Sequence, residues 1–219
     1  FNAYDPGSTW KPVTAIAGME SGKFPPNKKL NTVPCITYGS HCFPEYNKRG
    51  FGLIGYEDAF RVSSNTFFYQ IGVGVGSKAL YDAAIKLGFD NYTGIETLID
   101  ENKGLVGNEE WANKGRGWGN PGETPWIVED MASASIGQSV VLVTPLQLAR
   151  AYAVFANGGY LITPHLVDGN KNWRSKKYFQ KVDIKDTTLD TIRRGLRKVV
   201  TNGTAMEIRT DTSFSPSVA

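Results

Sequence analysis

Ser8 and Lys11 form the first pair of residues whose types and spacing suit a chemical reaction. On a helix, side chains three residues apart project from neighbouring parts of one face. A serine hydroxyl becomes a good nucleophile when a nearby base takes its proton. Lysine can be that base if burial or a neighbouring positive charge lowers its pKa, which is about 10.4 in water. The pair therefore predicts a serine nucleophile with a lysine base, although a capping serine beside a solvated lysine is the simpler interpretation.

A second pair of polar residues, Ser63 and Asn65, precedes the aromatic run 67–69. Its hydroxyl could relay a proton between nucleophile, lysine and leaving group, and its carboxamide could hold a substrate amide. The aromatic run is best explained as part of the core, and so is Trp10 beside the first pair. Each pair alone is a weak signal. Their occurrence together favours a serine enzyme.

Two predicted helical regions carry these residues. The first begins after Pro6-Gly7 and runs to about Glu20, because apolar residues recur at helical spacing between positions 13 and 19. The second covers 56–71. The segment 22–50 between them is polar and contains proline, so we expect irregular structure there that includes a short hairpin.

The other predicted elements surround these two regions, and helix predominates over strand. They are a helix over 78–87 capped by Ser77, a helix from Thr144-Pro145 to Asn157, a last helix capped by Thr187 or Thr188, and strands at 160–162 and 178–184. The glycine-rich stretch 101–130 is too long for a simple connection. Its three tryptophans favour an ordered loop.

The composition fits a globular domain and excludes several classes of protein. The 219 residues are 41% hydrophobic and 21% charged. A net charge of +3 argues against a protein that binds nucleic acid through a broad basic surface. No apolar run reaches the length of about 18 residues that a transmembrane helix needs.

Cys35 and Cys42 lie seven residues apart, with His41 beside the second. Two cysteines and one histidine are too few for a structural zinc site, which takes four ligands. We therefore predict no metal. A local disulfide in an oxidising compartment and a pair of free thiols both remain possible.

The order Ser-x-x-Lys, then Ser-x-Asn, begins the motif set of the penicillin-recognising serine enzymes, which ends with Lys-Thr-Gly. The segments 4–14 (YDPGSTWKPVT) and 62–70 (VSSNTFFYQ) resemble those of class B penicillin-binding proteins of the elongation type. Further similar segments are 134–138, 144–149 and 156–159, followed by Pro164 and His165. The resemblance spans most of the chain, but no Lys-Thr-Gly occurs in it.

The resemblance implies an α+β fold of the penicillin-binding-protein and serine β-lactamase type, with mostly its helical part present and much of the sheet missing. It implies a D,D-transpeptidase that cross-links peptidoglycan stem peptides without a cofactor. Ser8 would attack the D-Ala-D-Ala carbonyl, with Lys11 as general base. Ser63 would relay the proton to the leaving group, and Asn65 would bind the substrate amide. β-Lactams would acylate Ser8.

The resemblance also implies that residues 1–219 are a partial transpeptidase domain, which begins just before Ser-x-x-Lys and ends just before the expected Lys-Thr-Gly. Part of the oxyanion hole would then lie outside the chain, so the isolated piece should have little turnover and should expose apolar surface. An anchor outside the chain would place the domain on the periplasmic face of the inner membrane, with proteins of the wall-elongation complex as partners.

Alternative functions remain open at this point. A D,D-carboxypeptidase would use water as the acceptor, and a β-lactam sensor or a scaffold of the elongation complex would not turn over stem peptides. A class A β-lactamase is disfavoured, because we recognise no Glu-x-x-x-Asn pattern after Ser63 that would position a deacylating water.

Overall fold

Helices dominate the computed structural model of the chain, which describes residues 2–95, 100–117, 119–166 and 178–210. The α-helices are α1 (Lys11–Glu20), α2 (Tyr56–Arg61), α3 (Asn65–Val75), α4 (Ser77–Lys86), α5 (Glu109–Asn113), α6 (Val128–Ser135), α7 (Pro145–Ala156) and α8 (Asp186–Asn202). The described residues also form the 3-10 turns η1 (Gly7–Trp10) and η2 (Met206–Thr210). Within the described ranges, no helix is both long and apolar enough to cross a membrane.

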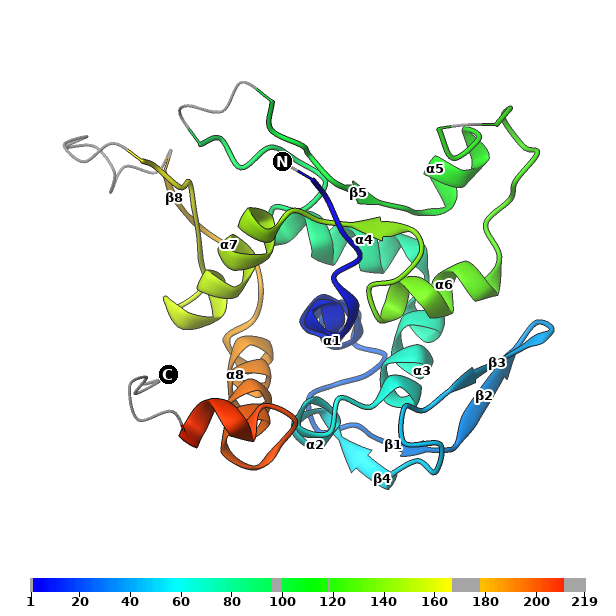
Figure 1. Cartoon of the computed structure of the whole chain (residues 1–219), viewed down its shortest axis with the longest axis vertical. Helices are drawn as coiled ribbons and strands as arrows, with labels where there is room; N and C mark the ends of the chain where they lie inside the picture. Colours follow the sequence, from blue (N-terminus) through cyan, green and yellow to red (C-terminus); the bar gives the residue numbers. More distant parts are fainter. Residues whose placement is uncertain (1, 96–99, 118, 167–177, 211–219) are drawn as a thin grey trace.

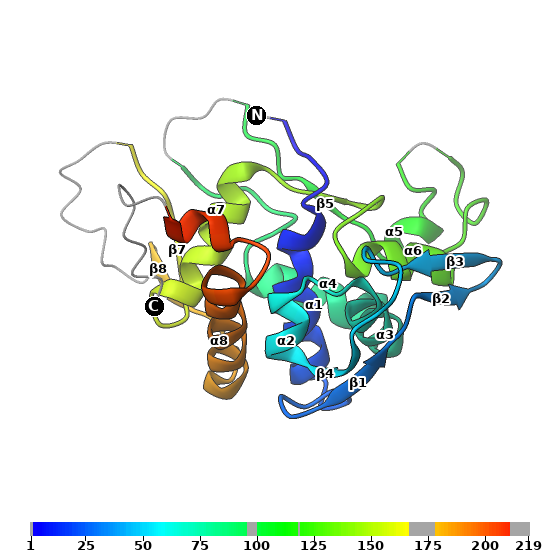
Figure 2. The same cartoon turned by 60° about the horizontal axis from the view of Figure 1, so that its bottom comes forward.

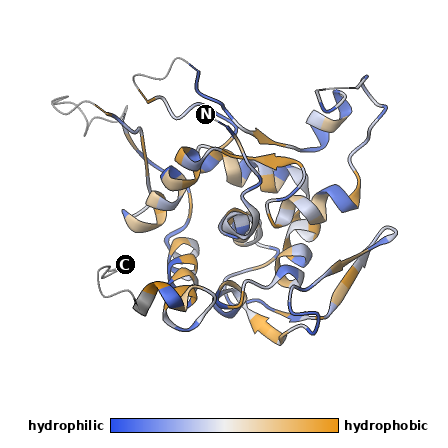
Figure 3. Cartoon of the chain, viewed as in Figure 1, coloured by the Kyte–Doolittle hydropathy of each residue, from blue (hydrophilic) through white to orange (hydrophobic). Residues whose placement is uncertain are grey.

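The strands are short and pair only in twos within the described residues. They are β1 (Lys29–Thr32), β2 (Cys35–Tyr38), β3 (His41–Pro44), β4 (Gly52–Gly55), β5 (Leu105–Val106), β6 (Val141–Leu142), β7 (Tyr160–Ile162) and β8 (Phe179–Lys181). The antiparallel pairs are β1–β4, β2–β3, β5–β6 and β7–β8. Figure 3 shows β4 as a hydrophobic strand at the edge of the molecule, and its Leu53 is 66% exposed.

Helix α1 forms the centre of the fold. Figure 1 looks along its axis and shows the other helices around it, and Figure 2 shows it between α8 and α3. Every residue from Lys11 to Met19 is buried. A Cβ at Gly18 would lie 2.6 Å from Ile71 and 2.7 Å from the hydroxyl of Tyr56, so only glycine lets these neighbours pack against the helix. The predicted first helix is therefore correct in extent, except that its first turn is the 3-10 turn η1.

The helical region predicted over 56–71 is present, but it consists of two helices, α2 and α3, with a break between them. Ser63, at the break, takes a left-handed conformation with φ +53°. Ser64 then caps α3 by accepting a hydrogen bond from the backbone N–H of Phe67. Apolar residues on both sides of the break are buried.

The hairpin expected within 22–50 is β2–β3, and a second ladder joins β1 to β4. Cys35 and Cys42 form a disulfide across this hairpin, so the interpretation as free thiols is wrong. The neighbouring His41 faces a carboxylate, because its Nδ1 lies 3.8 Å from an oxygen of Glu129. No cluster of metal-ligating side chains occurs in the part of the chain that the structure describes.

Most of the other predicted elements are present, with shifted caps. Helix α7 begins as expected, since Thr144 and Gln147 form a reciprocal capping box. Ser77 is the first residue of α4 rather than its cap, which is Gly76. Helix α8 begins at Asp186, before the threonines predicted to cap it.

Side chains from elsewhere in the fold account for the remaining differences. Glu20 at the end of α1 accepts a hydrogen bond of 2.5 Å from Thr188. A side chain from another helix therefore binds the first turn of α8. Strand β7 has the predicted bounds, but only Phe179–Lys181 of the predicted strand 178–184 pairs with it.

The stretch 101–130 is ordered where the structure describes it. Arg116 donates to both carboxylate oxygens of Asp130 and to the backbone carbonyls of Thr124 and Pro125. Its guanidinium also lies 5.7 Å from the ring centre of Trp111. Both charged groups of the pair are 12% exposed, so this ion pair with its extra hydrogen bonds fixes the loop onto the start of α6.

Candidate active site

Lys11, Ser63 and Asn65 meet at the break between α2 and α3. The ammonium nitrogen of Lys11 donates hydrogen bonds to the carbonyl oxygen of Ser63 (2.6 Å), to Ser63 Oγ (3.0 Å) and to Asn65 Oδ1 (2.9 Å). Lys11 is 1% exposed, and the ring centre of Phe68 lies 5.7 Å from its nitrogen. Lys11 of the first polar pair thus meets both residues of the second pair, from a position more than fifty residues away.

Burial changes the acid–base behaviour of Lys11. Desolvation disfavours its charged form and lowers its pKa to about 7, against an opposing effect of the Glu45 carboxylate, which raises it. Near neutral pH a large fraction of this amine is therefore uncharged and has a lone pair that can accept a proton.

Ser8 lies one turn before Lys11, in η1, and its side chain is exposed. Unlike Ser63, it makes no hydrogen bond to Lys11 in the described structure. The backbone around it is fixed, since Gly7 N–H donates to the carbonyl of Gly137 (2.9 Å) and Tyr152 donates to the carbonyl of Thr9 (3.0 Å). Ser8 is thus accessible to solvent, in the 3-10 turn that leads directly into the helix carrying Lys11.

The left-handed conformation of Ser63 turns both its carbonyl and its hydroxyl toward Lys11. Such a conformation costs a non-glycine residue about 1–3 kcal/mol and is concentrated at functional sites. The cap made by Ser64 and the burial of α3 hold the strained residue in place.

Glu45 is a part of this site that the sequence analysis did not single out. It is fully buried just after β3, and its carboxylate accepts hydrogen bonds from residues 64–66. Nothing in its local sequence marks it, because its partners lie about twenty residues further along the chain. A charged residue between a strand and a glycine-rich turn normally indicates a solvated loop.

Gly137 is a second residue whose role becomes clear only in the structure. It has φ +71°, and a Cβ there would lie 2.5 Å from Trp10 Cβ and 2.6 Å from the carbonyl oxygen of Gly7. Both neighbours belong to the turn that carries Ser8. The segment 134–138 therefore supports the turn by close packing.

We predict that Gly137→Ala displaces the turn bearing Ser8. Gly158→Ala is a matched control, because Gly158 also has positive φ (+87°) but open space around it. Both substitutions should pay the strain of about 1–3 kcal/mol, and Gly137→Ala should destabilise further and slow acylation by a penicillin at least about tenfold. Urea denaturation and acylation rates check this. Equal effects of the two substitutions would contradict the packing role of Gly137.

The argument against a class A β-lactamase used the absence of a Glu-x-x-x-Asn pattern after Ser63. That observation is wrong, because Glu109 and Asn113 have this spacing. They lie on α5, where they line an open pocket with Ser77 and Lys78, and neither contacts Lys11 or Ser63. Figure 1 shows α5 at the periphery, away from α1. The pattern thus occurs without the placement that a deacylating pair needs.

Several curated proteins similar to the chain are peptidoglycan D,D-transpeptidases named MrdA. The peptidoglycan D,D-transpeptidase MrdA of Acinetobacter baumannii is 30% identical over 94% of the chain, and that of Haemophilus influenzae is 29% identical over 97%. The chain spans about a third of the length of these curated relatives, 31% and 33%.

Solved structures of penicillin-binding protein 2 are also similar to the chain. The complex of penicillin-binding protein 2 with MreC from Helicobacter pylori matches 97% of the chain with a TM-score of 0.84 and 28% identity, over 38% of that chain. Penicillin-binding protein 2 of Pseudomonas aeruginosa in complex with WCK 5153 matches 97% with a TM-score of 0.80 and 26% identity, over 48% of that chain. The predicted α+β fold is confirmed.

A family model for the penicillin-binding protein transpeptidase domain matches residues 2–213, nearly the whole sequence. Its matched range includes both polar pairs, and the fold brings Ser63 and Asn65 to the buried amine of Lys11. The chain therefore belongs to the family of penicillin-binding protein transpeptidase domains.

Proposed function

We propose that the chain is the part of a peptidoglycan D,D-transpeptidase that carries its serine nucleophile and its general base. The observation that carries this proposal is the buried amine of Lys11, which has a pKa of about 7 and lies 3.0 Å from Ser63 Oγ and 2.9 Å from Asn65 Oδ1. An uncharged amine beside the Ser63 hydroxyl, one turn after Ser8, suits acyl transfer through serine.

In the proposed acylation step, Lys11 takes the proton of Ser8, and Ser8 Oγ attacks the carbonyl carbon of the penultimate D-Ala of a stem peptide. The tetrahedral intermediate collapses when the terminal D-Ala leaves. Its nitrogen receives a proton from Ser63 Oγ, which is replenished from Lys11 across their hydrogen bond. The product is an ester of Ser8, and the amine of Lys11 is again uncharged.

In the second step the amino group of another stem peptide attacks this ester, and the same groups move the proton in reverse. Asn65 is proposed to bind the amide of the acyl chain. Its Oδ1 accepts from Lys11, while its Nδ2 has only a long contact of 3.5 Å to the carbonyl of Pro44. That nitrogen can therefore donate to a substrate carbonyl. No step of this scheme draws on a cofactor.

The family of the chain supports β-lactams as inhibitors that acylate Ser8, since they resemble the D-Ala-D-Ala end of the substrate. Because one similar protein is solved in complex with MreC, we propose partners in the wall-elongation complex. The proposed location is the periplasmic face of the inner membrane, where the disulfide of the β2–β3 hairpin would be stable. We also propose that residues 1–219 are a part of the transpeptidase domain.

The test uses the full-length protein that contains these residues, incubated with a pentapeptide donor, with or without an amine acceptor. We expect D-Ala release together with a cross-linked product, detected by mass spectrometry. Release of D-Ala without a cross-linked product would support a D,D-carboxypeptidase instead. Labelling by fluorescent penicillin without any D-Ala release would support a β-lactam sensor or scaffold.

A further inference from the structure

Glu45 is a fully buried carboxylate at the amino end of α3, directly behind the site. It accepts hydrogen bonds from Ser64 Oγ (2.5 Å), Thr66 Oγ1 (2.8 Å) and the backbone N–H groups of Asn65 (2.6 Å) and Thr66 (3.1 Å). Four donors from three consecutive residues thus converge on one side chain. They belong to the same segment that presents Ser63 and Asn65 to Lys11.

The placement suits a negative charge. The first N–H groups of a helix lack partners within the helix, and the helix dipole is positive at this end. Hydrogen bonds to an ionised acceptor are about twice as strong as those between neutral groups. No lysine or arginine in the described ranges forms an ion pair with Glu45. Its burial is compensated by these four donors, by the backbone N–H of Tyr46 (3.2 Å) and by the field of α3.

The charge of Glu45 also acts on Lys11 without touching it. Its Coulombic effect opposes the desolvation that lowers the pKa of Lys11. Burial raises the pKa of Tyr69 to about 12, and the charge of Glu45 adds to that effect. The titratable groups that these interactions link are Lys11 on α1, Glu45 after β3 and Tyr69 on α3. Of these, Glu45 and Lys11 carry opposite charges when Lys11 is protonated.

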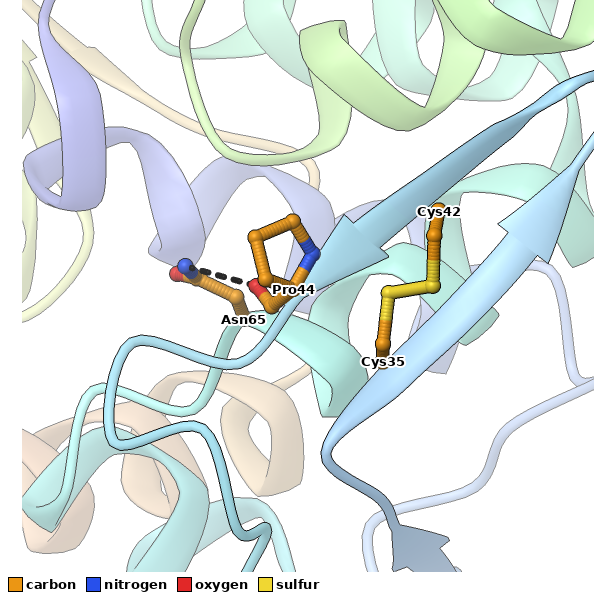
Figure 4. Close-up of a disulfide and its surroundings, with 4 residues drawn as sticks. All are labelled: Cys35, Cys42, Pro44 and Asn65. Atoms are coloured by element: carbon orange, nitrogen blue, oxygen red, sulfur yellow. Dashed lines mark hydrogen bonds between the residues drawn. A yellow bond between two sulfur atoms is a disulfide. The ribbon is translucent and has the colours of Figure 1, made fainter.

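The backbone of Glu45 is held by the disulfide-bonded hairpin. Its N–H donates to the carbonyl of Pro34 (2.9 Å), next to Cys35, and the preceding Pro44 accepts from Asn65 Nδ2. Figure 4 shows Asn65 beside Pro44 at the end of β3, with the Cys35–Cys42 bridge across the same hairpin. The carboxylate is thus presented by a cross-linked element rather than by a free loop.

We propose that Glu45 is a positioning residue of the acylation step, which holds Ser63 and Asn65 against Lys11 and balances the positive charge that Lys11 gains when it deprotonates Ser8. This inference rests on the proposed function, because it assigns Glu45 to the reaction of that same site. The proton moves from Ser8 Oγ to Lys11 Nζ, and Glu45 neither gives nor takes one.

The test compares acylation of full-length protein by fluorescent penicillin in Glu45→Gln, Glu45→Asp and wild type across pH. Glu45→Gln keeps the shape but removes the charge and places donors against donors. We expect its rate constant to fall about 10- to 100-fold. The acidic limb of its pH profile should move to lower pH, since the carboxylate no longer favours the protonated lysine. Glu45→Asp keeps the charge, so its limb should stay near the wild-type pH although the rate is reduced.

Glu129→Gln is the matched control, because Glu129 accepts from Ser40 N–H on the same hairpin but contacts none of residues 63–66. Its acylation rate constant and the acidic limb of its pH profile should equal those of wild type. If Glu45→Gln does not fold, Thr66→Val decides the question: it removes one donor to the carboxylate and should slow acylation about 3- to 10-fold with a melting temperature near wild type.

Two failures can be told apart. If the wild-type protein neither binds penicillin nor releases D-Ala, the proposed function is wrong. If wild type is active and folded Glu45→Gln, or Thr66→Val in its place, has the same rate and the same acidic limb, the role of Glu45 is wrong while the function stands.

Discussion

Replacing Lys11 with methionine should lower the rate of acylation by penicillin about 1,000-fold or more, without unfolding the protein. Methionine has a similar volume and fills the buried space, but it cannot accept the proton of Ser8. It also leaves Ser63 Oγ and Asn65 Oδ1 without their shared donor. The measurement is the second-order rate constant with fluorescent penicillin on the full-length protein. Lys86→Met is a suitable control, because Lys86 on α4 donates to the carbonyl of Asp183 and pairs with its carboxylate at 3.6 Å, away from Ser63 and Asn65.

The same substitution should change how stability depends on pH. The pKa of Lys11 is about 7 in the folded state and about 10.5 in the unfolded state, so the unfolded state binds more protons between these values. The contribution of Lys11 to the free energy of unfolding therefore rises with pH across this window. Lys11→Met should remove that rise, as urea denaturation at several pH values can determine. An unchanged pH dependence would mean that Lys11 keeps an ordinary pKa in the folded protein.

Ser8→Ala should abolish covalent labelling by penicillin, a loss of at least about 10,000-fold, because no other group in the proposed scheme forms the ester. The free energy of unfolding should change by less than about 0.5 kcal/mol, because the Ser8 side chain is exposed and makes no hydrogen bond to Lys11. This combination of a large chemical effect and a small effect on stability distinguishes a nucleophile from a structural serine.

Ser21→Ala serves as the control for that experiment. Ser21 lies at the other end of α1, where its hydroxyl donates to the carbonyl of Gly18. Labelling should be unaffected by its removal. Mass spectrometry of the wild-type adduct should place the penicilloyl group on the peptide that contains Ser8. An adduct on another residue, or labelling that survives Ser8→Ala, would show that the nucleophile is assigned wrongly.

The parts of the fold that depend on local chemistry were predictable from the sequence. Thr144-Pro145 specifies the start of α7 through a capping box and a proline at the first helical position, and neither needs a distant partner. The buried face of α1 likewise follows from its helical spacing of apolar residues. Predicted helix starts were wrong where tertiary contacts replace local capping. At the start of α8, for example, Glu20 of α1 accepts a hydrogen bond from Thr188.

The break between α2 and α3 shows why the site itself was only partly predictable. Residue types and spacing were enough to select Ser8 and Lys11 as a candidate pair at the start of one helix. Residue types also selected Ser63 and Asn65. The left-handed conformation of Ser63 could not, because it is maintained by the cap at Ser64 and the carboxylate of Glu45. That carboxylate arrives from a separate hairpin, and no periodicity or short motif encodes such a contact.

The central claim is that uncharged Lys11 takes the proton of Ser8, and the pH dependence of acylation tests it most directly. With wild-type full-length protein and excess penicillin label, the second-order rate constant should rise about tenfold per pH unit at low pH and level off above a midpoint of about 7, the pKa of Lys11. A rate constant that stays constant from about pH 5 to about pH 9 would contradict the claim, since a group that titrates near neutrality would then play no part in activating the serine.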